Sequence, residues 1–257
     1  MKTILIKCGG SVIDQLSEDF FTSLKELKKS GYQLVFVHGG GPDINEMLEV
    51  MGVEPEFHNG LRKTTAETLN IVEMVLSGKT NRKLVQLLSK HGLAAVGMNG
   101  TDDQLIQASI INEENLGLVG NVKQVNSDLI HMLLEKDYIP VITPLGSTED
   151  NKKLNINADY AAAAVAKSLN VEHCMFATDV EGIIIDGKVA SLLEENEVTH
   201  YIEEGQITGG MIPKVTSALA ALDSGLKSVM IVSGKKAFYQ DETLKGTQIV
   251  KKQEVIK

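Results

Sequence analysis

Three glycine-rich turns, two of which carry a lysine, contain the residues of this chain best suited to chemistry. They are residues 7–11 (KCGGS), 38–42 (HGGGP) and 208–214 (TGGMIPK). Because glycine has no Cβ, an anion can approach the backbone N–H groups of such turns closely. A neighbouring lysine adds a full positive charge. The pattern therefore suits a cradle for a phosphate or carboxylate group, with a tight turn of small residues as the alternative.

The second turn lies between a predicted strand and a predicted helix. Residues 34–37 form a short apolar run typical of a buried strand, and Pro42 suits the first turn of a helix. One face of that helix carries apolar residues at helical spacing, namely Ile44, Met47, Leu48 and Met51. The helix N-terminus adds about half a positive charge behind the glycines.

The rest of the chain alternates between strand and helix patterns. Strands are predicted at residues 3–6, 93–96, 139–144, 172–177, 227–232 and 247–250, the last of them at a sheet edge. Helices are predicted to carry residues 20–27, 65–76, 81–91, 127–136, 160–169, 194–205 and 214–222. Residues 105–125 suggest a hairpin beside the main sheet. This alternation predicts an α/β fold with a mostly parallel sheet and helices on both faces.

Length and composition restrict the organisation and the partners. The 257 residues suffice for one α/β domain or two close-packed halves, and the polar linker at 146–153 suggests halves of residues 1–150 and 151–257. A net charge of −9 argues against nucleic acid and an anionic membrane surface as partners. Two isolated cysteines, Cys8 and Cys174, and no apolar segment long enough for a signal peptide predict a reduced cytoplasmic protein.

Several common catalytic motifs are absent from the sequence. It contains no GxxxxGK[ST], no GxGxxG after a strand, no HExxH and no GxSxG, and no Cys/His cluster indicates a metal site. Glycine turns with lysines are suited to phosphoryl transfer, in which the protein mainly positions and neutralises the moving group. A carboxylate acceptor is already ionised at pH 7. The residues alone therefore predict an anion-handling α/β enzyme that transfers a phosphoryl group.

Four further residues have two interpretations each. Asp159 either stabilises the start of a small-residue helix or acts in a functional site. Arg62 is predicted on a loop before the helix at 65–76, where it is either a solvated surface residue or a bidentate carboxylate ligand. His38 is a structural histidine bonded to the glycine loop or a catalytic group. Cys8 has no accompanying base, which favours a packing role over that of a nucleophile.

Six stretches in this order resemble the amino-acid kinase family, and the resemblance covers residues 2–250. The stretches are KCGGS at 7–11, VHGGGP at 37–42, GLRKT at 60–64, LNINAD at 154–159, TDVEG at 178–182 and TGGMIPK at 208–214. The resemblance implies an open αβα sandwich with about eight central strands. It is greatest to members that use ATP to phosphorylate the side-chain carboxylate of N-acetyl-L-glutamate in arginine biosynthesis, giving N-acetyl-L-glutamyl 5-phosphate and ADP.

The resemblance also implies roles for individual residues. Lys7 and Lys214 would stabilise the transferring phosphoryl group, with Asp159 holding both lysines and the Gly10 N–H contacting the group. The acyl amino acid would bind in the amino-terminal half, to Gly40, Gly41, Arg62 and Asn155. ATP would bind in the carboxyl-terminal half, to Thr178, Asp179, Val180, Glu181, Gly182, Ile183, Gln206, Ile207 and Thr208. Mg²⁺ is implied with ATP, held by its phosphates and not by protein ligands.

The resemblance to the family leaves several alternative functions open. Other members of the family phosphorylate glutamate, aspartate, carbamate or a carrier-bound aminoadipate. A non-catalytic sensor of nucleotide or amino acid belongs to a different class, and the lysine pair argues against it. Arginine-inhibited members carry an additional amino-terminal helix that builds hexamers, whereas a strand is predicted from Thr3 here. We therefore expect a homodimer that arginine does not inhibit.

Overall fold

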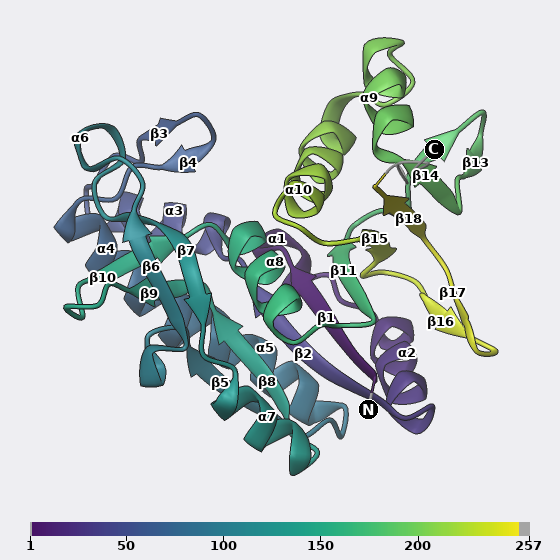
Figure 1. The fold of residues 1–257 in the computed structure, drawn as a ribbon, viewed down its shortest axis with the longest axis horizontal. Coiled ribbons are helices and arrows are strands. Elements are labelled where there is room, and N and C mark those ends of the chain that lie inside the picture. The colour runs from purple at the N-terminus through teal and green to yellow at the C-terminus, as the bar shows by residue number, and fades with distance from the viewer. Residues whose placement is uncertain (1, 252–257) are drawn as a thin grey trace, which may run out of the picture.

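The computed structural model describes residues 2–251, and its centre is an eight-stranded sheet (Figure 1). The spatial order of the strands is β14–β18–β15–β11–β1–β2–β8–β5, and neighbours are parallel except for β15 and β18. Their bounds are β1 Lys2–Cys8, β2 Tyr32–His38, β5 Ala95–Asn99, β8 Ile139–Thr143, β11 His173–Thr178, β14 Leu192–Glu194, β15 Ser228–Ser233 and β18 Thr247–Val250. The predicted fold class and strand number are confirmed.

Side chains of the central strands alternate between two hydrophobic cores, as the period of a strand requires. On β1, Ile4 and Ile6 face one core and Leu5 faces the other, and all three are fully buried. The first core lies under α2 (Glu18–Lys29) and α5 (Asn81–Lys90). The second lies under α7 (Asp128–Glu135), α8 (Ala158–Ser168) and α10 (Ile212–Asp223). Helices therefore cover both faces, as the alternating pattern predicts.

The shorter elements surround this sandwich. The helices are α1 (Gly10–Ile13), α3 (Gly41–Val50), α4 (Ala66–Glu73), α6 (Glu113–Leu116) and α9 (Glu195–Glu203), with 3₁₀ turns η2 (Asp102–Gln104) and η3 (Gly209–Met211). The small hairpins are β3–β4 (Phe57–His58, Leu61–Arg62), β12–β13 (Ile184–Ile185, Lys188–Val189) and β16–β17 (Tyr239–Gln240, Thr243–Leu244). Among residues 2–251, no helix combines the length and apolar character needed to cross a membrane.

A small closed barrel stands beside the main sheet. It consists of β6 (Ile106–Ile110), β7 (Val119–Val125), β9 (Leu145–Ser147) and β10 (Lys153–Ile156). The hairpin predicted at residues 105–125 is confirmed, because β6 and β7 pair antiparallel. The linker predicted at 146–153 is shorter than expected, because both ends of that segment lie in paired strands. Gly146 permits this pairing, since a Cβ there would lie 2.8 Å from the Ile106 carbonyl oxygen.

The helices α4 and α5 join through a π-helix, η1 (Met74–Thr80). The sequence predicts two separate helices here, and it predicts Thr64 or Thr65 as the cap of the first. The cap is Thr65, because its hydroxyl accepts a hydrogen bond from the Thr68 N–H at 3.1 Å. The wider turns of η1 place Thr80 against the second glycine turn. A Cβ on Gly40 would lie 3.1 Å from the Thr80 hydroxyl oxygen.

Two strand predictions need correction. Residues 247–250 form an inner strand, β18, because the three-residue strand β14 pairs along its outer side. A three-residue strand is too short to show a pattern in the sequence. The strand predicted at 93–96 lies at 95–99 and includes Gly97, where a Cβ would overlap the side chains of Asn81 and Arg82.

Candidate active site

The candidate site lies at the carboxyl-terminal edge of the parallel strands, where ligands collect in open α/β sheets. Cys8 at the end of β1 is in register with His38 at the end of β2 and with Ala177 near the end of β11. The first two glycine turns and residues 178–182 therefore begin side by side.

A cavity of about 340 Å³ opens at this edge. Its walls include Lys7 and Ser11 from the first turn, Thr178 and Asp179 from the end of β11, and Lys214 and Ser217 from α10. The fold thus brings two lysines from opposite ends of the chain into one cavity, together with two of the residues predicted to bind nucleotide.

Lys7 is held by a short ion pair. Its Nζ lies 2.7 Å from Asp159 Oδ1, and each of the two side chains is only 17% exposed. The other carboxylate oxygen of Asp159 accepts a hydrogen bond from the Ser217 hydroxyl at 2.8 Å. Asp159 is not the cap of α8, because the Asn157 side chain accepts from the backbone N–H groups of Asp159 and Tyr160. Asp159 therefore connects β1 to α10 through side chains.

Lys214 has different partners. Its Nζ donates to the Gly210 carbonyl at 2.7 Å and lies 3.1 Å from Asp179 Oδ1. The hydrogen bond from Lys214 lowers the pKa of Asp179 below its usual value. The family resemblance implies that Asp159 holds both lysines, but in this structure Asp159 pairs with Lys7 and Asp179 pairs with Lys214.

The first two glycine turns are packed against each other. A Cβ on Gly10 would lie 2.7 Å from the Gly40 Cα and 2.9 Å from the Gly40 nitrogen, which no side chain tolerates. Gly41, in contrast, has open space where a Cβ would be. Close backbone approach is therefore the reason for glycine at position 10, whereas a Cβ on Gly40 would overlap the Leu76 side chain.

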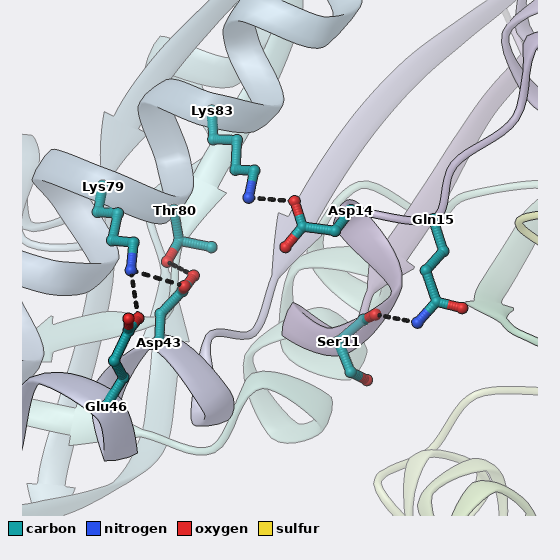
Figure 2. A network of polar contacts seen from close by, with 8 residues as sticks. All are labelled: Ser11, Asp14, Gln15, Asp43, Glu46, Lys79, Thr80 and Lys83. Atoms are coloured by element: carbon teal, nitrogen blue, oxygen red, sulfur yellow. Dashed lines mark hydrogen bonds and ion pairs between the residues drawn. The ribbon is translucent and has the colours of Figure 1, made fainter. Parts of the chain in front are cut away.

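A polar network supports these turns from the side of η1 and α5 (Figure 2). Asp43 in the first turn of α3 accepts from the Thr80 hydroxyl at 2.8 Å and lies 3.1 Å from Lys79 Nζ. Burial alone would raise the pKa of Asp43, but these contacts outweigh it and the pKa is lowered. Lys83 forms an ion pair with Asp14, next to α1. Both helices that follow the glycine turns are thus linked to η1 and α5.

The residues predicted to bind the acyl amino acid form a chain of contacts. Arg62 lies on β4, not on a loop as predicted, and its Nη2 donates to the Asn45 Oδ1 of α3 at 2.6 Å. Asn155 Nδ2 donates to the Thr64 hydroxyl at 3.0 Å, and that hydroxyl donates to the Arg62 carbonyl at 2.9 Å. Arg62 and Asn155 are therefore positioned relative to each other through Thr64.

The guanidinium group of Arg62 keeps one nitrogen without a partner. Its Nη1 is buried, and no group within residues 2–251 forms a hydrogen bond with it. Burial lowers the pKa of Arg62, and the group also lies 4.7 Å from the centre of the Phe57 ring. An unpaired buried donor is costly, so this nitrogen is suited to an anionic ligand.

The residues predicted to bind nucleotide follow β11 and precede α10. Thr178 lies at the end of β11, and Glu181 pairs with Lys236 at 2.6 Å. The Ile183 N–H donates to the Thr247 hydroxyl at 2.8 Å, which connects this segment to β18. The other predicted nucleotide-binding residues belong to the same two segments, namely Asp179, Val180, Gly182, Gln206, Ile207 and Thr208. Ile207 is buried in the core beneath α10.

Two residues with open interpretations are now placed. Cys8 is fully buried, and burial raises the pKa of its thiol to about 12, so it is a packing residue as predicted. His38 is also fully buried, and burial lowers its pKa to about 4, so the ring is neutral at pH 7. Its Nδ1 lies 3.0 Å from the Gly39 carbonyl oxygen, which confirms the expected contact with the glycine loop.

The described part of the chain contains no cluster of metal ligands, and it has a second cavity away from the two lysines. Across the described residues there is no group of three or more His, Cys, Asp or Glu side chains that could hold a metal ion. The acidic groups nearest the cavity, Asp159 and Asp179, are each paired with a lysine. A larger hollow of about 1090 Å³ lies between β7 and the helices α8 and α10, and neither Lys7 nor Lys214 lines it.

Sequence reasoning missed three residues of the site. Ser217 lies three residues after Lys214, a spacing that places both on one helix face, and this signal could have identified it. The position of Thr64 before a helix predicts only a capping role, whereas its hydroxyl connects Asn155 to Arg62. Asn45 gave no signal, because its contact with Arg62 depends on how β4 folds over α3.

Comparisons with known proteins agree with this geometry. The Amino acid kinase family profile matches residues 2–233. Acetylglutamate kinase of Geobacillus sp. (strain WCH70) is 52% identical over 248 residues, covering 96% of both chains, and that of Bacillus subtilis (strain 168) is 48% identical over 255 residues, covering 99% of both.

Solved structures give the same result. The crystal structure of smu.665 from Streptococcus mutans UA159 superposes with a TM-score of 0.81 at 34% identity, covering 96% of this chain and 98% of that one. The carbamate kinase of Giardia shares the fold, with a TM-score of 0.65 at 18% identity and coverage of 98% and 99%. With a matching family profile, close relatives along nearly the whole chain and the lysine-lined cavity at the sheet edge, this chain belongs to the amino acid kinase family.

Proposed function

We propose that this enzyme transfers the γ-phosphoryl group of ATP to the side-chain carboxylate of N-acetyl-L-glutamate, a step of arginine biosynthesis. The observation that carries the proposal is the meeting of Lys7 and Lys214 in one cavity next to two glycine turns. Relatives named acetylglutamate kinase, at about half identity over nearly the full chain, support the choice of acceptor.

Charge neutralisation and positioning account for the chemistry. The acceptor carboxylate is ionised at neutral pH, so it needs no general base. Lys7 and Lys214 balance negative charge on the transferring oxygens, and the N–H groups of Gly10 and Gly40 donate to them. Because Asp159 holds Lys7 at 2.7 Å, that charge is in place before the substrate arrives.

The acceptor site is proposed around Arg62. The unpartnered Nη1 would bind the α-carboxylate, and Asn155 would bind the acetamido group, with Gly40 and Gly41 along the glutamate chain. The contacts through Thr64 support this arrangement, because they set the spacing between Arg62 and Asn155.

The nucleotide is proposed to enter as MgATP. It would bind to the carboxyl-terminal half of the chain, residues 151–257, while the acyl amino acid would bind to residues 1–150. The lysine-paired acids at the cavity favour Mg²⁺ coming with the phosphates of the nucleotide. Residues 178–183 and 206–208 would contact the nucleotide.

We further propose that the enzyme works as a cytoplasmic homodimer that arginine does not inhibit. Two free, buried cysteines suit a reducing compartment. Large exposed apolar side chains at the end of α3 and the start of η1 support a surface for a second copy, namely Val50, Met51 directly after α3, and Met74. Light scattering should give twice the monomer mass, and a hexamer or inhibition by micromolar arginine would refute this part.

The central test measures ADP release with MgATP and each of four acceptors. N-acetyl-L-glutamate should be turned over, and L-glutamate, L-aspartate and carbamate should not. Turnover with another acceptor would refute the substrate assignment and keep the phosphate machinery. Binding of ATP without turnover of any acceptor would favour a sensor.

Arg62→Lys tests the acceptor site separately. A lysine keeps the positive charge and loses the bidentate fork, so the KM for N-acetyl-L-glutamate should rise about tenfold while kcat changes little. The matched control is Lys63→Arg, whose position pairs with the exposed Glu56, and it should leave KM unchanged. An unchanged KM in Arg62→Lys would place Arg62 outside the acceptor site.

A further inference from the structure

His38 forms a fully buried hydrogen-bond cluster directly beneath the second glycine turn. Its Nδ1 lies 3.0 Å from the Gly39 carbonyl oxygen, and its Nε2 lies 3.2 Å from Asn81 Nδ2 and 3.3 Å from the Thr143 hydroxyl. His38, Asn81 and Thr143 are each 0% exposed. The proposed mechanism uses none of these side chains, yet the fold places three polar groups where apolar packing would be expected.

The partners of Asn81 determine which ring nitrogen carries the proton. Asn81 Oδ1 accepts from the Arg82 guanidinium, so the amide nitrogen is the end that faces Val141 and His38. This nitrogen donates one hydrogen to the Val141 carbonyl at 2.8 Å and the other to His38 Nε2. His38 Nε2 is therefore an acceptor, and the single ring proton lies on Nδ1, which donates to the Gly39 carbonyl.

That contact fixes the peptide group between Gly39 and Gly40. A trans peptide is planar, so its N–H points opposite to its C=O, and the described chain has no cis peptide bond. His38 and Asn81 lie on the α5 side of the sheet, and they draw the Gly39 carbonyl toward that side. The Gly40 N–H must then point toward the opposite side, where Lys7 and Asp159 lie.

The peptide group between Gly39 and Gly40 can rotate freely unless other contacts restrict its orientation. Gly39 and Gly40 have no side chain to fix their dihedral angles, and Gly40 is the N-cap of α3, so its N–H has no partner in the helix. We propose that His38 is a positioning residue, whose Nδ1–H holds the Gly39–Gly40 peptide so that the Gly40 N–H faces the transferring phosphoryl group. The inference rests on the proposed kinase activity and assigns His38 a role in it.

Two substitutions of His38 test the roles of its two ring nitrogens separately. Asparagine places an amide nitrogen near the position of Nδ1, so it can still donate to the Gly39 carbonyl. Glutamine places its amide near the position of Nε2, so it can still accept from Asn81 but loses the hydrogen bond to Gly39. His38→Gln should therefore lower kcat about 10- to 100-fold, somewhat less than outright loss of an oxyanion donor, while His38→Asn should stay within about fivefold. The KM values for both substrates should change less than about threefold in each variant.

Ser23→Ala is the matched control for buried polarity. Ser23 on α2 is 1% exposed and accepts from the Phe238 and Tyr239 N–H groups, and its hydroxyl contacts none of the three glycine turns. It should lower the unfolding midpoint and leave kcat unchanged. Equal losses of kcat in His38→Asn and His38→Gln, or a wild-type kcat in His38→Gln, would overturn the positioning role.

An NMR experiment on the wild-type enzyme tests the same proposal without turnover. With ¹⁵N-labelled histidine, His38 should show the neutral Nδ1–H tautomer throughout pH 6 to 8. An Nε2–H tautomer would overturn the inference even if the enzyme is active. Absence of turnover by the wild-type enzyme would instead refute the proposed function and leave this tautomer measurement valid.

Discussion

The two lysine-bearing turns of the site differ in how firmly they are held. Lys7 stands on the central strand β1, pairs with the mostly buried Asp159, and is followed by Gly10, which packs directly against Gly40. Lys214 follows a turn in which a Cβ on Gly210 would meet nothing nearer than the lysine's own Nζ at 3.8 Å. Its partner, Asp179, is 44% exposed.

This difference indicates that the charge of Lys7 is held by contacts in the core, whereas the charge of Lys214 is positioned by a turn at the surface. Contacts of the first lysine cross between β1, α8 and α10, so it cannot move without repacking. The second lysine pairs with the Gly210 carbonyl and the partly exposed Asp179, partners that a bound nucleotide can replace. We therefore expect substitutions around Lys7 to act through geometry and those around Lys214 to act mainly through charge.

The largest effect is expected when either lysine is removed. Lys7→Ala and Lys214→Ala should each lower kcat by about 10²–10³, the range for losing a preorganised charge or donor. Steady-state kinetics with N-acetyl-L-glutamate would measure this. Lys29→Ala, which removes an exposed lysine of α2 that pairs with Glu26, is the matched control and should behave like the wild type. A near-normal kcat in either site variant would remove that lysine from the mechanism.

Alanine at the two turns sharpens the comparison directly. Gly10→Ala forces the first turn away from Gly40 and should lower kcat about 10²-fold, since a misplacement of about 1 Å has that cost. Gly210→Ala brings a methyl group into ordinary contact with Lys214 Nζ and nothing closer, so it should lower kcat about tenfold at most. Circular dichroism would verify folding of both. Equal losses would mean that the two turns are equally constrained.

The buried histidine under the firmly held turns should make stability depend on pH. The pKa of His38 falls from 6.5 to about 4 on folding because burial disfavours the charged ring. Between pH 6.5 and pH 4 the unfolded chain binds more protons, so stability is lost as the pH falls through this window. From pH 7.5 to pH 5, the wild type should lose about 2 kcal/mol more than His38→Asn.

Urea denaturation at the two pH values would measure this difference, and Ser23→Ala should show the same pH dependence as the wild type. If the free energy of unfolding fell by the same amount in the wild type and in His38→Asn, folding would not lower the pKa of His38. The comparison of variants cancels the contribution of the other histidines, which both proteins contain.

The smallest effects are expected at the carboxylates that hold the lysines. Asp159→Asn should lower kcat about tenfold, because it weakens a charged contact that is largely shielded from water. Asp179→Asn should change kcat less than about fivefold, since ion pairs with an exposed partner contribute little. Added salt should narrow the gap between Asp179→Asn and the wild type. A reversed order would contradict the assignment of Lys7 as the fixed charge.

Much of the architecture could be predicted from local patterns. The apolar runs of β1, β2 and β11, the helical spacing in α2, α3 and α10, and the alternation between them indicated a parallel sheet covered on both faces. These signals are local, because the period of an element is written in a few successive residues. The same holds for the glycine turns, which showed where backbone N–H groups could meet an anion.

The sequence by itself determined which segments become strands, helices and phosphate-type turns, and which lysines belong to those turns. Only the tertiary structure decided that Asp179 and not Asp159 pairs with Lys214, that β14 covers β18, and that Asn81 sets the tautomer of His38. Those outcomes depend on contacts between residues far apart in the chain. Their distances follow from how helices and strands pack together, and no local period records that packing.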